Sequence, residues 1–232
     1  MMALRRWGAL ALSVIPAVHL AAQVGHDPAH SPYRDIPRGG AAVASVGYLG
    51  GGRGDVGVGK ADGATAGVRY EAALGRVIGV SFGFAYALTT RFVVDPAKDS
   101  LSRKSGPVDD GTILVDAGLQ LNLTGQKSWH GLAPYLGGAL GMAFSPARVA
   151  ADTSGYTFGT KITLAPNAGL RWYAGRRLSV RADARLVLWR LSYPIAFRVP
   201  NQFDGSSVLP PGAPLGQWTA HPWVTIGLGW IF

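Results

Sequence analysis

The segment 77–92 alternates at every second position between large apolar residues and small or polar ones. One face carries Ile78, Val80, Phe82, Phe84, Tyr86 and Leu88, and the other carries Gly79, Ser81, Gly83, Ala85, Ala87 and Thr89. A period of two predicts a β-strand, because successive side chains of a strand point to opposite faces. Strands of soluble sandwiches put their polar residues outside. Here the small face fits a narrow barrel lumen, and the large apolar face fits contact with lipid.

Four further segments repeat this alternation: 112–123, 161–173, 178–191 and 224–232. Three weaker segments, 41–50, 64–73 and 132–144, bring the number to eight. Their length of about ten residues is what a tilted strand needs to cross a bilayer. We therefore predict an all-β fold, a transmembrane antiparallel up-and-down β-barrel of eight strands.

The connections between these segments alternate in length. They cover 53–63, 74–76, 95–111, 124–131, 145–160, 175–177 and 193–222. Outer-membrane barrels have short periplasmic turns and long outside loops. With a periplasmic N-terminus, the alternation places every long loop outside the cell.

Two local features modify this pattern. Pro166 lies inside the segment 161–173 and lacks the N–H that a ladder needs, so we expect a bulge or a local irregularity there. Aromatic residues gather near the strand ends, which is typical of interfacial girdles: Tyr48, Phe92, Phe144, Trp172, Tyr173, Trp189, Tyr193, Trp223 and Trp230.

The N-terminus carries the pattern of an export signal. Arg5 and Arg6 precede an apolar run that begins at Trp7 and ends at about Ala22. This run is too short to span a bilayer comfortably, and no later stretch of about 18 apolar residues follows it. We therefore expect a signal peptide over residues 1–22, cleaved near Ala22, and an exported chain.

The composition agrees with an exported membrane protein. The 232-residue chain is 48% hydrophobic but only 15% charged, and a barrel spreads such apolar residues over every second position of short strands. The chain has no cysteine, so disulfides do not contribute to its stability. Residues 23–40 are polar and rich in proline, which predicts a flexible periplasmic lead-in. The barrel then covers residues 41–232.

The C-terminal sequence WVTIGLGWIF, which ends on Phe232, resembles the terminal strand of bacterial outer-membrane barrels. The segments APYLGGALG (133–141) and LRWYAGRRLSVRADARLVLWR (170–190) look like small barrels of the outer-membrane protein A and X type. The resemblance covers about residues 40–232. It implies that Phe232, with Trp230 before it, forms part of the signal that the barrel assembly machinery recognises. It implies no catalytic residue.

One glycine-rich motif imitates a nucleotide site. GDVGVGKA at 54–61 has the glycine and lysine spacing of a phosphate loop. A true site needs Ser or Thr after Lys60 to bind Mg²⁺, and a helix whose N-terminus meets the phosphates. Here Ala61 follows, and the next segment has the pattern of a strand. We interpret the motif as a Gly-rich loop.

The positions of two histidines bear on the hypothesis that the protein is an enzyme. His130 and His221 are predicted in a short turn and in a long loop, on opposite sides of the membrane, so they cannot share a site. His221 could still act alone with Asp204 or Ser206, which leaves a lipid-modifying enzyme as the third functional hypothesis. We expect no enzymatic activity, no cofactor and no metal site.

The inward-facing charges form the most informative group. They are Arg69, Glu71, Asp116, Lys161, Arg171, Arg181, Asp183 and Arg185. Because an isolated charge inside a narrow barrel is costly, these groups have to pair, and we interpret them as a salt-bridged plug. The alternative is a narrow pore that favours anions, since the cations outnumber the acids five to three.

These observations predict an outer-membrane barrel with a structural or surface-interaction role. A narrow passive channel for small solutes is the alternative. The net charge is +9, and it falls to +7 when Arg5 and Arg6 leave with the signal. Export argues against nucleic acid as a partner. We expect outer-membrane lipids and the assembly machinery as partners, and a monomer.

Overall fold

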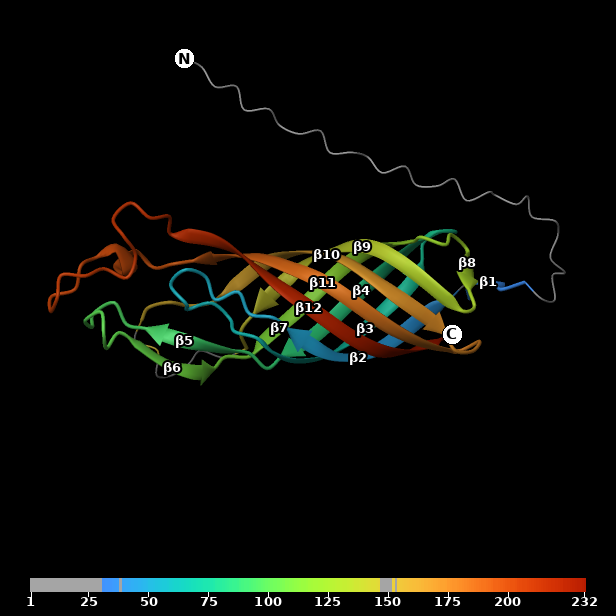
Figure 1. Cartoon of the computed structure of the whole chain (residues 1–232), viewed down its shortest axis with the longest axis horizontal. Coiled ribbons are helices and arrows are strands. Elements are labelled where there is room, and N and C mark those ends of the chain that lie inside the picture. Colours follow the sequence, from blue (N-terminus) through green and yellow to red (C-terminus); the bar gives the residue numbers. More distant parts are fainter. Residues whose placement is uncertain (1–30, 38, 147–151, 153) are drawn as a thin grey trace, which may run out of the picture. The chain divides into compact units, whose positions relative to one another are not determined.

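Eight antiparallel strands close into a barrel (Figure 1). In ring order they are β2 (Gly40–Leu49), β3 (Gly63–Ala73), β4 (Ile78–Ala87), β7 (Thr112–Asn122), β9 (Leu132–Phe144), β10 (Thr160–Tyr173), β11 (Leu178–Ser192) and β12 (Gly216–Ile231). Each strand pairs with the next, and β12 pairs with β2 to close the ring. Closure leaves no barrel strand with an unpaired edge. The predicted eight-stranded barrel is confirmed.

The computed structural model describes residues 31–37, 39–146, 152 and 154–232. The expected signal peptide and residues 23–30 and 38 of the expected lead-in lie outside this part and stay predictions. The chain contacts define a unit from Tyr33 to Phe232, which contains the barrel. Within the described residues, no helix is long and apolar enough to cross a membrane.

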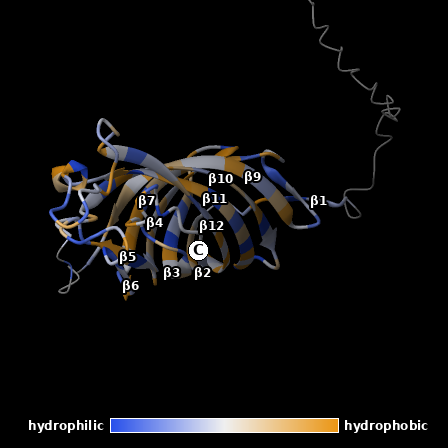
Figure 2. Cartoon of the chain, turned by 60° about the vertical axis from the view of Figure 1, so that its left-hand side comes forward, coloured by the Kyte–Doolittle hydropathy of each residue, from blue (hydrophilic) through white to orange (hydrophobic). Residues whose placement is uncertain are grey.

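The outer wall of the barrel is apolar. Large side chains such as Phe82, Leu119, Leu140 and Ile226 are more than half exposed on it, and Figure 2 shows hydrophobic and polar positions alternating along the strands. At roughly 25 cal/mol per Å² of apolar surface, such a belt is unfavourable in water and favourable in lipid. The alternation predicted for 112–123 and 178–191 appears as regular exposed and buried positions.

The connections at one end are short. Residues 74–77 and 174–177 form two turns, and the third connection, 123–131, carries β8 (Lys127–Trp129). We call this the short-loop end. The expected lead-in contributes a strand here that the sequence pattern did not predict: β1 (Tyr33–Asp35) pairs with β8.

The connections at the other end, the long-loop end, are much longer. They cover residues 50–62, 88–111, 145–159 and 193–215. The second of them carries a hairpin of β5 (Thr90–Val94) and β6 (Lys104–Asp109), and the fourth carries a short 3-10 helix, η2 (Ile195–Arg198). The long and short connections alternate in the order predicted.

Two local expectations need correction, and a third is met in one of its two forms. Strand β12 begins at Gly216, so residues 216–222 belong to a strand and not to a loop. At Pro166 the expected local irregularity is present as a gap in the pairing of β10 with β11 at Ala165 and Pro166, and it is not a bulge, because the register is the same on both sides. Three aromatics expected in an interfacial girdle instead lie buried: Trp189 and Trp223 occupy inward positions of β11 and β12, and Tyr193 follows β11 at the start of the fourth long loop.

Candidate functional site

Seven of the eight predicted inward charges are joined by ion pairs in the lumen. We call this group the lumen network; it consists of Arg69, Glu71, Asp116, Arg171, Arg181, Asp183 and Arg185. Its members come from β3, β7, β10 and β11. Each occupies an inward position of its strand, so the period of two alone directs them to the same space.

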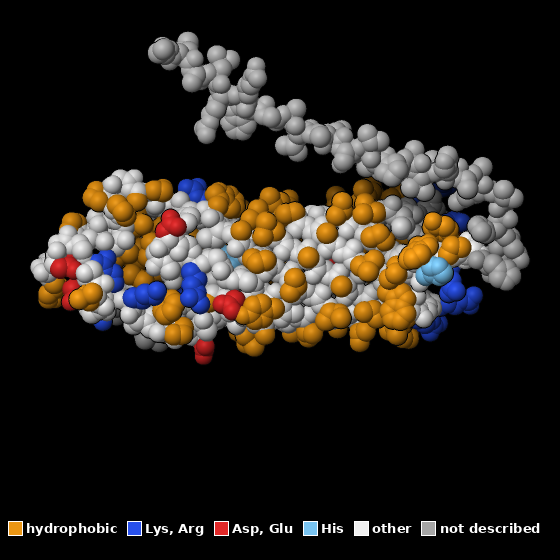
Figure 3. All heavy atoms as spheres, in the orientation of Figure 1, with side chains coloured by type: hydrophobic (Ala, Val, Ile, Leu, Met, Phe, Trp, Pro, Cys, Tyr) orange, Lys and Arg blue, Asp and Glu red, His pale blue; other side chains and the backbone are white. Residues whose placement is uncertain are grey.

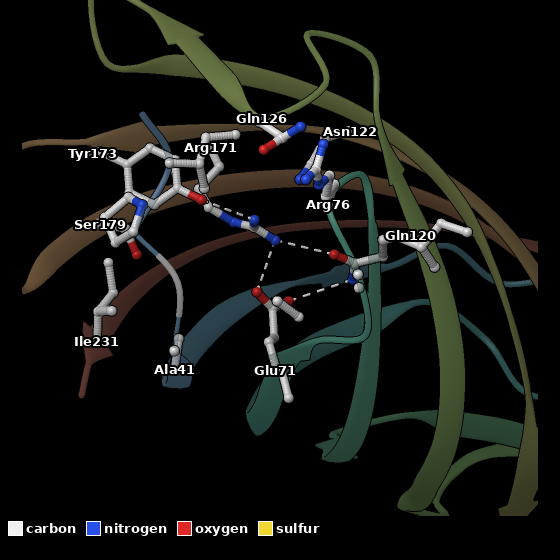
Figure 4. Close-up of a pocket in the computed structure, with 18 of the residues that line it drawn as sticks. Ala41, Glu71, Arg76, Gln120, Asn122, Gln126, Arg171, Tyr173, Ser179 and Ile231 are labelled. Atoms are coloured by element: carbon white, nitrogen blue, oxygen red, sulfur yellow. Dashed lines mark hydrogen bonds and ion pairs between the residues drawn. The ribbon is translucent and has the colours of Figure 1, made fainter. Parts of the chain in front are cut away.

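Glu71 lies at the end of the network nearest the short-loop end. Its carboxylate accepts a hydrogen bond of 2.8 Å from Arg171 Nη2 and also pairs with Arg181. Arg171 donates a second hydrogen bond of 3.0 Å to Gln120 Oε1, and Gln120 Nε2 donates to Glu71 at 3.4 Å (Figure 4). Two cations and one amide therefore share this carboxylate.

Arg181 and Asp183 form the centre of the network. Arg181 is 2% exposed and donates a hydrogen bond of 2.8 Å from Nη2 to Asp183 Oδ1. The Tyr135 hydroxyl also donates to Asp183, and the Arg181 guanidinium lies 4.7 Å from the centre of the Tyr135 ring. Gly169 leaves the space for this tyrosine, because a Cβ there would overlap its hydroxyl.

Asp116 holds the remaining two arginines. Its carboxylate lies 3.4 Å from Arg69 Nη2 and 3.2 Å from Arg185 Nη1. Arg69 also donates to Ser81 Oγ at 3.2 Å, and the Arg185 guanidinium lies 5.1 Å from the centre of the Trp223 ring. Charge-assisted hydrogen bonds of this kind offset the cost of removing the ions from water.

Lys161 does not belong to the lumen network. It lies near the start of β10 at the long-loop end, where its ammonium is 3.5 Å from Ser192 Oγ. Among the described residues it forms no ion pair. The period of two correctly predicted that Lys161 lies on the inward face of its strand. It did not predict the position of Lys161 along the barrel axis.

Aromatic side chains fill the lumen between the network and the long loops. The Trp189 and His221 rings are fully buried and stack with their centres 3.7 Å apart. Trp223 donates a hydrogen bond of 3.0 Å from Nε1 to Thr65 Oγ1. Phe158, from the third long loop, meets Trp189 edge to face at 5.7 Å.

This position of His221 corrects the expectation that it lies in a loop. It is in β12, where Nδ1 accepts a hydrogen bond of 3.1 Å from the Gly52 N–H and Nε2 lies 3.0 Å from Thr219 Oγ1. Asp204 and Ser206 bond to each other and to residues of the second and fourth long loops. His221 therefore pairs with neither Asp204 nor Ser206.

A second charged group joins the long loops, and the sequence analysis did not find it. We call it the loop cluster; it consists of Lys60, Arg91, Asp110 and Asp152. Lys60 is fully buried, 2.7 Å from Asp110 Oδ1, and it donates to Ser145 Oγ at 2.6 Å. Burial lowers the pKa of Lys60 from 10.5 to about 8, and the pairing with Asp110 opposes this shift.

The glycine-rich motif at 54–61 supplies this lysine. Its ammonium is occupied by protein oxygens and lies 4.7 Å from the centre of the Phe158 ring. The strand β3 follows, as expected, and not a helix. No local signal marks the loop cluster in the sequence, because its four members come from three separate connections.

A cavity of about 290 Å³ lies at the short-loop end, and we call it the vestibule. Glu71, Gln120 and Arg171 of the lumen form part of its wall, and Arg76 and Tyr173 belong to the neighbouring turns and strand (Figure 4). Within the described residues, no group of three His, Cys, Asp or Glu side chains could hold a metal ion.

The two residues of the expected assembly signal lie on the outer wall. Trp230 and Phe232 are 53% and 66% exposed, and the Phe232 ring stacks on Tyr70 with the centres 6.2 Å apart. They are accessible from the membrane side at the short-loop end.

The barrel is similar to solved outer-membrane proteins. The outer membrane protein OprG from Pseudomonas aeruginosa matches with a TM-score of 0.54 at 13% identity, over 85% of this chain and 98% of that one. Neisserial surface protein A matches with a TM-score of 0.50 at 11% identity, over 87% of this chain and 98% of that one. No family model and no curated protein sequence matches this chain.

Identities this low show the fold alone. Together with the apolar belt, they define the chain as a transmembrane β-barrel with the fold of small outer-membrane barrels. The resemblance inferred from the C-terminal strand is confirmed for the fold.

Proposed function

We propose that this chain is a sealed outer-membrane barrel that presents its long loops outside the cell in a structural or surface-interaction role. The apolar belt and the similarity to outer-membrane barrels support the location. The alternating connections support the orientation, with the short-loop end in the periplasm.

The observation that carries the proposal is the filled lumen. Arg181 and the neighbouring Tyr135 in the middle of the lumen, and Trp189 nearer the long loops, are each at most 2% exposed. A water-filled pore would leave at least part of these side chains in contact with solvent. The ion pairs between facing strands act as a plug that holds the wall together from inside.

The arrangement of the outer loops supports an interaction role. The Ser100 N–H donates a hydrogen bond of 2.8 Å to Asp204 Oδ2, which ties the second long loop to the fourth. Hydrogen bonds from Ser206 and Ser100 hold the pKa of Asp204 well below its usual range. Leu101 and Phe203, beside this contact, are 96% and 80% exposed. Two large apolar side chains exposed at one contact between loops support a contact site for a partner.

Single-channel recording in planar bilayers tests the proposal. A denaturing gel first checks the folding of the purified protein. If the unboiled form migrates differently from the boiled form, the protein is folded as a barrel. Such protein should insert and show no stable unitary currents. Regular current steps would overturn the sealed barrel in favour of the passive channel. Release of fatty acid or transfer of an acyl chain in a lipid assay would instead favour an enzyme.

A further inference from the structure

The short-loop end carries a strong excess of positive charge. Among the described residues, the turns and short strands of this end carry one acidic side chain, that of Asp35, and five exposed cations: Arg34, Arg76, Lys127, Arg176 and Arg177. Figure 3 shows Lys and Arg side chains gathered at the end of the barrel where Figure 1 places β1 and β8. None of the five takes part in the lumen network or in the loop cluster.

Aromatic residues mark this end as the level of a membrane interface. Trp129, Trp172 and Trp230 are each about half exposed near the ends of their strands, and tryptophans favour the headgroup region of a bilayer. The Arg177 guanidinium lies 6.0 Å from the centre of the Trp230 ring. The cation is therefore at the height where lipid phosphates lie.

An apolar groove starts next to this pair. Two adjoining hollows of about 310 and 820 Å³ lie on the outer wall over β11, β12, β2 and β3, and both are lined by Ala44, Val68 and Leu228. The first hollow reaches Leu178 and Trp230, the neighbours of Arg177. The groove therefore runs from the basic end toward the middle of the belt, across the pairing of β12 with β2 that closes the barrel.

We propose that this surface is a binding site for an anionic phospholipid of the leaflet that the short-loop end faces. The lipid phosphate binds Arg177 and Arg176, and one acyl chain lies in the groove over Ala44 and Leu228. The chemistry of the two parts matches that of the lipid: cations for its head and a continuous apolar hollow for its tail. A phospholipid with no net charge would keep the tail contact and lose most of the gain at the head.

This inference rests on the proposed membrane location. The test compares retention of phosphatidylglycerol and phosphatidylcholine by the refolded protein in detergent, measured by native mass spectrometry. The wild type should retain phosphatidylglycerol preferentially. Arg176→Gln with Arg177→Gln should lower that preference by about 25-fold, since each of the two interfacial cations contributes roughly a fivefold gain.

Two further variants separate the parts of the site. Lys98→Gln with Lys104→Gln removes two exposed cations at the long-loop end and should leave the preference unchanged. Ala44→Leu should reduce retention of both lipids, because it fills the groove. An unchanged preference in the Arg176 and Arg177 variant, or an equal loss in the lysine control, would overturn the lipid site. Failure of the wild type to insert into membranes would overturn the membrane location instead.

Discussion

Glu71 and Arg171 lie on diametrically opposed strands, and an ion pair of 2.8 Å joins them across the lumen. Their strands, β3 and β10, are four steps apart in either direction round the eight-stranded ring. A solute that passed along the barrel axis would have to separate this pair. The same carboxylate also binds Arg181, so a connected network and not a single contact crosses the lumen.

The network predicts a specific cost for removing one of its acids. Asp183→Ala leaves Arg181 with Glu71 alone and removes the acceptor of the Tyr135 hydroxyl. Uncompensated buried cations should lower the free energy of unfolding by about 3–5 kcal/mol, as the loss of one partner does in other buried pairs. Thermal unfolding in detergent measures this as a clear fall in Tm.

The exposed Asp109 of β6 provides the matched control. Asp109→Ala should change the stability by no more than about 0.5 kcal/mol, as surface substitutions usually do. A wet lumen would solvate the arginines, and Asp183→Ala would then cost only about 0–1 kcal/mol. Equal Tm values for the two variants, with a raised anion current in the Asp183 variant, would favour the channel.

The pKa of Lys60 predicts a pH dependence of stability. Burial holds this pKa at about 8, below the ordinary 10.5. Between these values the unfolded chain binds more protons than the folded one, so the free energy of unfolding should rise as pH rises from about 8. Chemical unfolding of wild type and Lys60→Met between pH 8 and about 9.5 isolates this contribution.

The Lys60→Met variant should still fold, because Asp110 keeps its ion pair of 2.8 Å with Arg91. The wild type should gain stability relative to this variant over the interval. Parallel pH profiles for the two proteins would show that the lysine keeps its ordinary pKa.

The strands were predictable because lipid and lumen impose opposite chemistry on alternate residues. Arg181, Asp183 and Arg185 face inward for this reason, and their common face follows from their spacing alone. The start of β12 was not predictable in this way. Pro222 indicates the end of a strand in the sequence, but in the structure it lies inside β12, opposite Leu186.

Contacts between loops that are distant in the sequence are not marked by any periodic pattern of residues. Lys60 and Asp110 meet across 50 residues through the folding of two separate loops. The alternation of residues also does not predict how far along the barrel axis a residue lies. For this reason Lys161 was assigned to a network that it does not reach.

The orientation predicts where trypsin cuts intact cells. Lys98 and Lys104 are exposed at the long-loop end, and Arg176 and Arg177 are exposed at the short-loop end. With the long loops outside, mass spectrometry should find cleavage after the two lysines and none after the two arginines. Cleavage after the arginines with intact long loops would invert the topology.

The exposed C-terminal aromatic predicts an effect on assembly. Phe232→Ala should lower the amount of folded protein in the outer membrane of cells, because the resemblance gives this residue a place in the assembly signal. Refolding of the purified variant in detergent should stay close to that of the wild type, since Phe232 is 66% exposed. An equal loss in both settings would assign the residue a role in stability, and unchanged assembly would remove it from the signal.

Chemical access to the middle of the lumen tests the sealed barrel most directly. The chain has no cysteine, so a single Ser81→Cys introduces the only thiol at a lumen position that is 1% exposed. In protein refolded into lipid vesicles, a small charged methanethiosulfonate should leave this thiol unmodified and should label it after unfolding. Ser102→Cys, in an exposed loop, should react in both states. Rapid labelling of the Ser81→Cys thiol in the folded barrel would contradict a filled lumen.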